Sequence, residues 1–473
     1  MKKLRLVLFW IWLGFETGAL GQVPGTKLWE IILGNHVFSS PALSADGTIY
    51  VGVASSAFGE PLSPNGWLYA ISPQGTTNWL VRTFGEIRAS PAIGPDGTVY
   101  VGSVLGDIYS FSPAGTTNWV FAAGKFPTLY RSFVGSSPAI GSDGTVYVNT
   151  VGGYEPGASY RDRLYSFRPN GTTNWALALN SLPDNRIESI CFSSPAILPD
   201  GTICVATRDR RLFAISPGGT TNWVISLGTR TFSSPAIGRD GTIYLGAEDF
   251  KVHAVHPEGV QQWMFATGSF IESSAAVSFD TIYIGSLDSS FYALNLNGSK
   301  RWSVPNLMVS ASPALTTDGS IYVVGVTSGL LYRLDSAGKT VWTLDLKPGE
   351  LCFSSPVVGA DGTIYVGAGK KLFAVSDTNA PAANPWPAFR GDVKHTARAI
   401  QRGIQTPSIT PDGSFAMVLN VETGRTYHVE SSTDLASWSE LTNFVSDSHS
   451  FQLRDPGITN SPQRYYRLHT SVP

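Results

Sequence analysis

One phrase returns eight times along the chain, and no other feature constrains the fold as strongly. Its first copy reads SPAL at Ser40–Leu43 and DGTIYVG at Asp46–Gly52. The remaining copies begin at Ser90, Ser137, Ser194, Ser234, Ser274, Ser312 and Ser355, at a mean spacing of about 45 residues. A fixed period of this length indicates a repeat architecture, in which like units pack side by side.

Each copy predicts four short β-strands. An Asp-Gly pair between two β-branched runs, as at Asp46-Gly47, predicts a hairpin, because both central residues of a type I′ turn need positive φ. A third run such as Leu68–Ser72 leads into a Pro-x-Gly-Thr turn, and an Asn-Trp pair opens the fourth run. The chain shows no sustained helical period after its N-terminal apolar run. Four-stranded units at this period predict an all-β fold, an eight-bladed β-propeller.

A tryptophan also recurs once in each repeat, at a fixed place after the Pro-x-Gly-Thr turn. The eight are Trp29, Trp79, Trp119, Trp175, Trp223, Trp263, Trp302 and Trp342. We interpret them as structural rings that dock one blade against the next, and a row of aromatic rings for sugar binding is the alternative. A buried Trp side chain removes about 150–250 Å² from water. That burial stabilises by at most about 4–6 kcal/mol.

The two ends of the repeat array complement each other. Gly25–Trp29 resembles the end of a blade that has no beginning, whereas Ser355–Val375 begins a blade and lacks the usual ending. We expect the N-terminal strand to complete the eighth blade, which would leave fewer open sheet edges.

These residues resemble the quinoprotein-like propeller superfamily, which includes alcohol dehydrogenases dependent on pyrroloquinoline quinone (PQQ) and an outer-membrane assembly scaffold. The A-x-S-P-x-G-T-x-x-W stretches are similar to the family's tryptophan-docking motif. Pro385–Asp392, with His395-Thr396, is similar to the family phrase W-P-x-F-R-G-D-x-x-H-T. The resemblance covers about residues 25–400 and implies the eight-bladed fold. Inside such a phrase, Arg390–Asp392 is interpreted as structural and not as a cell-adhesion tripeptide.

The resemblance also implies features of the dehydrogenases that this sequence lacks. Those enzymes use a disulfide between adjacent cysteines and a calcium site of Glu, Asn and Asp. Here the three cysteines are Cys191, Cys204 and Cys352, and no two are adjacent. No motif carries the calcium ligands to a position in this chain. We therefore predict no cofactor. PQQ with calcium remains an alternative, for which Glu86 or Glu188 would be the candidate carboxylate.

The N-terminus predicts export. Lys2, Lys3 and Arg5 precede the apolar run Leu6–Phe15, which is too short to span a bilayer. Small residues place the expected cleavage before Gln22, so residues 1–21 are the predicted signal peptide. No Cys stands there for a lipid anchor. We expect a secreted, periplasmic or cell-envelope protein that is not a lipoprotein and has no transmembrane segment. The formal net charge of −2 provides no basic excess for nucleic-acid binding.

Uneven insertions predict a binding face. The connections before the first strand and between the second and third strands open on one face of a propeller, and the long ones belong to repeats 1, 3 and 4. Loops on a rigid scaffold commonly carry function, and Arg and Tyr are typical interface anchors. The candidate residues are Glu86, Arg88, Tyr130, Arg131, Tyr154, Tyr160, Arg161, Arg163, Arg186, Glu188, Arg208 and Arg210. Solvated loops with local ion pairs are the alternative. A protein or glycan partner and a monomeric state are expected.

The predicted domains are the propeller at residues 25–376, a linker at 377–403 that holds the W-P-x-F-R-G-D phrase, and a small β-sandwich at 404–473. Within the last, strands are expected at 414–421, 425–431, 444–453 and 464–468. The function expected from all of this is a non-catalytic binding or protein-interaction scaffold that acts through its long-loop face. The alternatives are a divergent PQQ-dependent oxidoreductase and an outer-membrane assembly scaffold.

Overall fold

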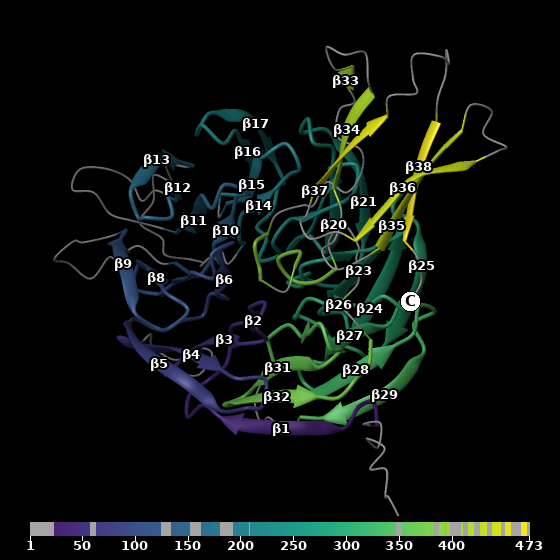
Figure 1. Ribbon diagram of the computed structural model, residues 1–473. Helices are drawn as coiled ribbons and strands as arrows, with labels where there is room; N and C mark the ends of the chain where they lie inside the picture. The colour runs from purple at the N-terminus through teal and green to yellow at the C-terminus, as the bar shows by residue number, and fades with distance from the viewer. Residues whose placement is uncertain are drawn as a thin grey trace, which may run out of the picture. The chain divides into compact units, whose positions relative to one another are not determined.

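Every regular element of the computed structural model is a β-strand within the described residues, and Figure 1 shows the strands arranged as blades around a ring. Eight four-stranded sheets and two three-stranded sheets form. The prediction of an eight-bladed propeller is therefore confirmed, and the two C-terminal sheets are compatible with the predicted small β-sandwich. The structure describes residues 23–56, 63–123, 134–151, 162–179, 193–207, 209–346, 352–379, 381, 387–392, 394–397, 408–409, 415–420, 426–432, 438–445, 450–455 and 465–470. No helix that could span a membrane occurs in those ranges.

The blades are numbered 1 to 8 from the first complete sheet, and in each the strands run outward from the channel. The innermost strands are β2 (Ala42–Leu43), β6 (Ala92–Ile93), β10 (Ala139–Ile140), β14 (Ala196–Ile197), β18 (Ala236–Ile237), β22 (Ala276–Val277), β26 (Ala314–Leu315) and β30 (Val357–Val358). The second strands are β3 (Ile49–Ala54), β7 (Val99–Gly102), β11 (Val146–Thr150), β15 (Ile203–Ala206), β19 (Ile243–Gly246), β23 (Thr281–Ser286), β27 (Ile321–Val324) and β31 (Ile364–Ala368). The third strands are β4 (Asn65–Ile71), β8 (Asp107–Phe111), β12 (Arg163–Phe167), β16 (Arg211–Ile215), β20 (Lys251–Val255), β24 (Ser290–Asn295), β28 (Leu330–Leu334) and β32 (Lys371–Val375). The outermost strands are β5 (Thr77–Phe84), β9 (Thr117–Ala122), β13 (Thr173–Ala178), β17 (Thr221–Ser226), β21 (Gln261–Ala266), β25 (Lys300–Pro305), β29 (Thr340–Asp345) and β1 (Lys27–Ile32).

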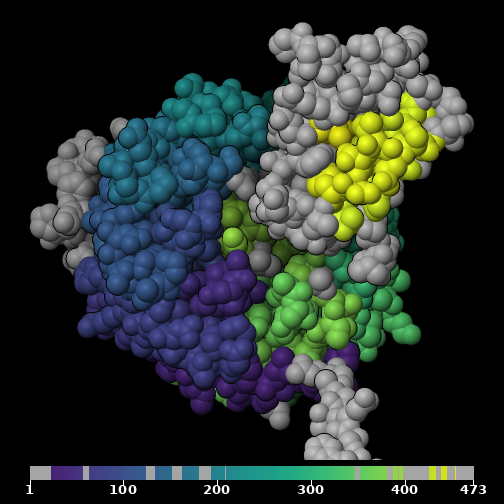
Figure 2. Space-filling model, in the orientation of Figure 1, coloured from purple at the N-terminus to yellow at the C-terminus, as the bar shows by residue number. Residues whose placement is uncertain are grey.

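The N-terminal strand closes the ring, as the complementary ends of the repeat predict. Strand β1 pairs antiparallel with β32 and supplies the outermost strand of blade 8. The backbone N–H groups of Gly25 and Ser376 donate across this junction, each over 2.8 Å, to the carbonyls of Ser376 and Thr26. In Figure 1 the purple β1 lies beside the green β32, and in Figure 2 purple atoms of the first described residues lie against green atoms of the last blade. Closure through β1 ties the two ends of the array together.

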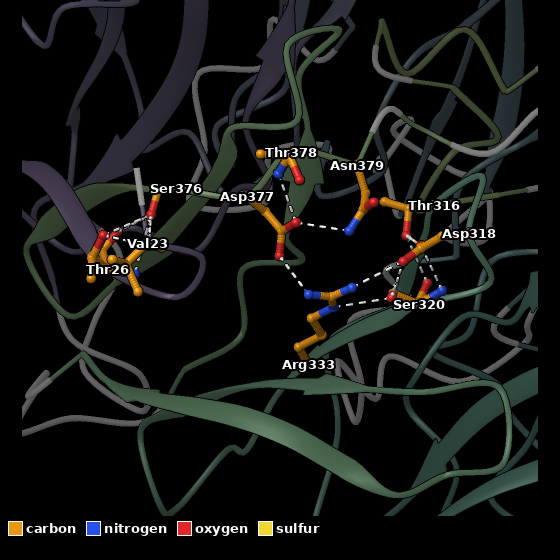
Figure 3. Close-up of polar contacts among 10 residues, drawn as sticks. All are labelled: Val23, Thr26, Thr316, Asp318, Ser320, Arg333, Ser376, Asp377, Thr378 and Asn379. Carbon is orange, nitrogen blue, oxygen red and sulfur yellow. Dashed lines mark hydrogen bonds and ion pairs between the residues drawn. The ribbon is translucent and has the colours of Figure 1, made fainter. Parts of the chain in front are cut away.

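A buried charge holds the chain as it leaves blade 8. Figure 3 shows the Arg333 guanidinium between two carboxylates, 2.9 Å from Asp318 and 3.4 Å from Asp377. The Asp377 carboxylate is fully buried, and its Oδ1 accepts the N–H of Thr378 at 2.7 Å and the side-chain amide of Asn379 at 2.8 Å. This link fixes the exit of the last repeat against blade 7.

Each tryptophan of the ladder rests on a glycine of the following blade. A Cβ added to that glycine would lie 2.6–2.8 Å from the indole ring in all eight cases, and every one of these glycines has positive φ. The pairs are Trp29–Gly75, Trp79–Gly115, Trp119–Gly171, Trp175–Gly219, Trp223–Gly259, Trp263–Gly298, Trp302–Gly338 and Trp342–Gly25. Seven indole Nε1 groups also donate to a carbonyl of the next blade's turn at 2.7–3.0 Å. The rings are half-buried, so the energy for a buried ring is an upper limit.

The hydrophobic core lies between blades and not within them. One buried cluster joins Val357 and Leu372 of blade 8 to Leu43, Ile49 and Val51 of blade 1. A second cluster joins blades 1 and 2 in the same way, around Leu68 and Phe111. Because each blade buries its two faces against its neighbours, stability is shared around the ring.

A segment after the repeats crosses the channel on the side of the Asp-Gly turns. Its carbonyls accept N–H groups from the innermost strands of four blades, at 2.7–2.9 Å. The pairs are Leu315 with Pro387, Ile93 with Lys394, Ile140 with Thr396 and Ile197 with Ala397. The described residues among 387–397, hereafter the plug, thus close one end of the channel. They lie within the first of two compact units, which ends at Arg398.

Two buried basic side chains fix the plug. Arg390 is 1% exposed and donates to the carbonyls of Ser137, Pro138 and Pro195, which belong to blades 3 and 4. Burial lowers the pKa of Arg390 to about 9. The Nδ1–H of His395 donates to the Pro91 carbonyl of blade 2 over 3.1 Å. The sequence interpretation of Arg390–Asp392 as structural agrees with this burial.

The C-terminal unit, residues 399–473, has two antiparallel sheets. One contains β33 (Ser408–Ile409), β34 (Phe415–Asn420) and β37 (Ser450–Asp455), and the other contains β36 (Ser439–Val445), β35 (Thr426–Ser432) and β38 (Tyr465–Thr470). The single strand expected at 444–453 is instead the end of β36 and part of β37, which lie in different sheets. The polar stretch after Val445 separates the two apolar runs.

Trp223→Ala is expected to lower the free energy of unfolding by about 2–4 kcal/mol, because the ring contact and the 2.7 Å hydrogen bond to Pro257 are lost together. Gly259→Ala should also destabilise, since its Cβ would lie 2.8 Å from the ring at φ +85°. In the Trp223→Ala background the steric part of that cost should vanish. Denaturant unfolding of both single variants and the double variant measures the coupling.

Gly34→Ala is the matched control for this cycle, because Gly34 has φ +77° and no atom within 4 Å of the added Cβ. It reports the cost of backbone strain alone. Strictly additive costs for Trp223→Ala and Gly259→Ala would contradict the docking contact.

His395 predicts a pH dependence of stability. Burial, reinforced by the charge of Arg390, lowers the pKa of His395 to about 3 from its ordinary value of 6.5. The unfolded chain therefore binds a proton that the folded chain excludes, and this contribution to stability is lost as pH falls from about 6.5 toward 3. The stability advantage of wild type over His395→Gln should shrink by up to about 1.4 kcal/mol per pH unit below pH 6.5. Urea unfolding of both proteins between pH 7.5 and 4.5 measures this, and parallel pH curves would refute it.

Candidate functional site

A ring of eight serines surrounds the channel. The N–H of each serine donates to the hydroxyl oxygen of the serine on the next blade, over 2.8–3.2 Å, and the last donates back to the first. The members, all buried, are Ser40, Ser90, Ser137, Ser194, Ser234, Ser274, Ser312 and Ser355. These are the serines that open each repeat phrase. The ring satisfies eight buried N–H groups and sets the diameter of the channel.

The channel holds a pocket of about 230 Å³ that is lined by the serine ring together with Phe389 of the plug. This volume is smaller than the about 300–1,000 Å³ of pockets for drug-sized ligands. Because the plug closes the turn side, the pocket belongs to the face that carries the loops before the innermost strands. A small ligand would therefore enter from the loop face.

A second set of side chains, which we name the upper ring, stands at the position two residues before each ring serine. Its members that line the pocket are Phe38, Arg88, Gly135, Phe232, Glu272, Ser310 and Phe353 on blades 1, 2, 3, 5, 6, 7 and 8. Phe192 occupies this position on blade 4 and lies outside the described residues. The serine ring is uniform, whereas the upper ring contains five residue types at seven positions, so the upper ring is the part of the pocket that could give specificity.

On blade 2, Arg88 is held by Glu86. Its Nε donates to Glu86 Oε2 over 3.0 Å, and its Nη2 lies 3.0 Å from the same oxygen. Glu86 is fully buried, and its Oε1 accepts the N–H groups of Ser56 at 2.9 Å and Ser63 at 3.1 Å and the hydroxyl of Ser56. The Arg88 guanidinium also lies 5.1 Å from the centre of the Phe38 ring. The buried pair is therefore neutral overall and orients a cation over an aromatic face.

On blade 6, Glu272 is half-buried and accepts a hydrogen bond from the Ser310 hydroxyl at 2.8 Å. No cationic side chain pairs with it among the residues that the structure describes. Blade 6 is four blades from blade 2, so Glu272 and Arg88 stand on opposite sides of the eight-bladed ring. The pocket thus has one internally neutralised charge and one carboxylate without a counter-ion.

Of the predicted binding-face residues, the structure brings together Glu86 and Arg88, and of these two only Arg88 lines the pocket. Arg163 begins β12, and the exposed Arg210 lies in the turn before β16 with φ 71°. The others fall outside the described residues: Tyr130, Arg131, Tyr154, Tyr160, Arg161, Arg186, Glu188 and Arg208. The eight predicted docking tryptophans all lie at the blade junctions given above.

Sequence reasoning did not predict Phe38, Phe232, Glu272 or Phe353 as site residues. The available signal was position, because each stands two residues before the serine of a repeat phrase. Rotational symmetry brings equivalent positions of a repeat to one axis, so a variable position inside a constant phrase is a candidate lining position.

The described donors do not fit a calcium-bound quinone. Calcium takes six to eight oxygen ligands, with carboxylates prominent among them. Glu272 is the one carboxylate in the described pocket lining, since Glu86 is bound to Ser56 and Ser63. No group of three His, Cys, Asp or Glu side chains suited to a metal occurs in the described ranges. Cys204 and Cys352 are buried on different blades, and burial raises the pKa of the Cys204 thiol. Cys191 lies outside those ranges.

Solved structures share this fold. BamB from Moraxella catarrhalis matches with a TM-score of 0.56 and 16% identity, over 75% of this chain and 100% of that one. A europium-containing methanol dehydrogenase matches with a TM-score of 0.56 and 12% identity, over 80% of this chain and 91% of that one. Sqt1 from Chaetomium thermophilum has a TM-score of 0.57 and 14% identity, over 74% and 98% of the two chains. Such identities establish the fold alone. No curated protein sequence matches the chain.

A family model gives the more specific relation. The model described as outer membrane protein assembly factor BamB matches residues 160–316 and 208–440. These matches cover the last two strands of blade 3, the described blades 4 to 7 in full, the strands β30 to β32 of blade 8, the plug, and the C-terminal unit as far as residue 440. Together they span more than half of the sequence, and the chain therefore belongs to the family described as outer membrane protein assembly factor BamB.

Proposed function

We propose that this protein is an exported, non-catalytic binding scaffold of the cell envelope, and that it recognises its partner through the loop face. One observation carries this proposal: a constant serine ring supports a pocket whose upper ring combines phenylalanine, arginine, glutamate, serine and glycine on different blades. A scaffold that holds varied side chains around one opening is suited to recognition. Membership of the BamB family supports a place in the cell envelope, and the N-terminal sequence supports export.

A non-catalytic role is supported by the chemistry of the lining. The serine hydroxyl oxygens each accept an N–H, and no histidine or second carboxylate lines the described pocket to act as a base. The divergent oxidoreductase stays the competing function. The second candidate, an assembly scaffold at the outer membrane, is favoured by the family match and uses the same face.

Photo-crosslinking in intact cells of the source organism tests which face is used. A photoreactive amino acid at Arg210 or Phe250, both exposed on the loop face, is expected to give discrete adducts. The matched controls are Glu258 and Asn297, exposed in turns on the opposite face, which should give none. Adducts from the control positions alone, or from neither face, would overturn the proposed surface. An adduct with an outer-membrane assembly protein would select the assembly scaffold.

A dye-linked assay tests the oxidoreductase alternative. Purified mature protein is incubated with PQQ and calcium, and a primary alcohol and a redox dye are added. The expected result is no dye reduction above that of a heat-denatured sample. Saturable, calcium-dependent reduction would make this protein an oxidoreductase and refute the non-catalytic role.

A further inference from the structure

Residues of the upper ring on opposite blades form a pattern with approximate two-fold symmetry. Phe38 on blade 1 stands opposite Phe232 on blade 5, and Arg88 on blade 2 stands opposite Glu272 on blade 6. The neighbouring pair Phe38–Arg88 is therefore matched across the pocket by the neighbouring pair Phe232–Glu272. One side presents an aromatic ring with a cation, and the other presents an aromatic ring with a carboxylate.

The first side shows how a cation is held in this channel. The Arg88 guanidinium lies 5.1 Å from the centre of the Phe38 ring, and the Glu86 carboxylate balances its charge over 3.0 Å. Attraction between a cation and an aromatic face, strengthened by a nearby carboxylate, stabilises this arrangement. The protein supplies all three components there.

On the second side, Phe232 and Glu272 both line the pocket, and the Glu272 carboxylate accepts a hydrogen bond from the Ser310 hydroxyl at 2.8 Å. No protein cation pairs with Glu272 in the described ranges. A cation bound in the pocket would be attracted to the Glu272 carboxylate.

We propose that the pocket binds a small organic ammonium cation, with its charge against Glu272 and its alkyl groups against Phe232. This proposal rests on the proposed function and names the ligand class of its pocket. Phe353 and the floor residue Phe389 add apolar surface around the ligand. Arg88, whose charge is balanced by Glu86, lines the opposite side of the same pocket.

Isothermal titration calorimetry with choline and its neutral carbon isostere, 3,3-dimethylbutan-1-ol, tests the charge requirement. The two probes have nearly the same shape, and both carry a hydroxyl group. Choline is expected to bind at least tenfold more tightly than the alcohol. Equal affinities, or binding of neither probe, would overturn the proposal. Glycine betaine, which carries a carboxylate where choline carries a hydroxyl, is a third probe. A higher affinity for glycine betaine than for choline would indicate that its carboxylate lies near the Arg88 guanidinium.

Glu272→Gln should weaken choline binding at least tenfold and leave the affinity for the neutral alcohol unchanged. Phe232→Leu should weaken choline binding and preserve the apolar contact. Glu258→Gln is the control, because Glu258 is an exposed glutamate on the opposite face. Each variant must keep the wild-type unfolding midpoint, which is expected of Glu272→Gln since an amide retains the Ser310 hydrogen bond. Unchanged choline binding in Glu272→Gln would refute the assignment.

Failure of these titrations and failure of the proposed function are distinguishable. Loop-face adducts without ammonium binding would remove the ligand class and leave the scaffold. Ammonium binding without loop-face adducts would leave the pocket as a site and remove the partner surface.

Discussion

The contact of each outer-strand tryptophan with a glycine of the next blade is the interaction on which the ring depends. Eight indole rings lie on eight glycines of positive φ, and any larger residue there would push the ring away. The eighth contact, between Trp342 and Gly25, includes the segment that leads into β1. Docking and closure are thus coupled, because the strand that completes blade 8 also supplies the surface on which blade 7 rests.

The closure of the ring through β1 and the tryptophan contacts determines how the innermost strands are arranged around the channel. When eight blades are held at equal spacing, their first strands approach one another closely enough for the serine hydrogen bonds to run unbroken around the channel. The plug then uses innermost N–H groups that no blade satisfies, and it closes one end. A channel that would otherwise be open at both ends becomes a pocket with one mouth.

The family match and the pocket give complementary information. The match places the chain with the BamB assembly factors and does not describe the lining of its channel. The lining includes four phenylalanines, an arginine whose charge Glu86 balances, and one glutamate with no cationic side chain paired to it in the described ranges. The serine ring is bonded to itself around the channel, and under the proposed function the upper ring would provide recognition.

The sequence by itself determined the eight blades, their strands, the closing strand and the docking ladder, because these depend on short-range patterns that repeat. The Asp-Gly hairpins and the spacing of the tryptophans can be recognised in the amino-acid sequence alone. The sequence also predicted a binding face on the loop side, with Arg88 among its residues. Only the tertiary structure decided that Glu86 is buried against Ser56 and Ser63, that the plug floors the channel, and that Glu272 faces Arg88. These depend on contacts between residues that are 23 to 304 positions apart in the chain, and they form when the ring closes. No local pattern encodes such contacts, because the distance between two blades across an axis is fixed by the whole ring and not by any one repeat.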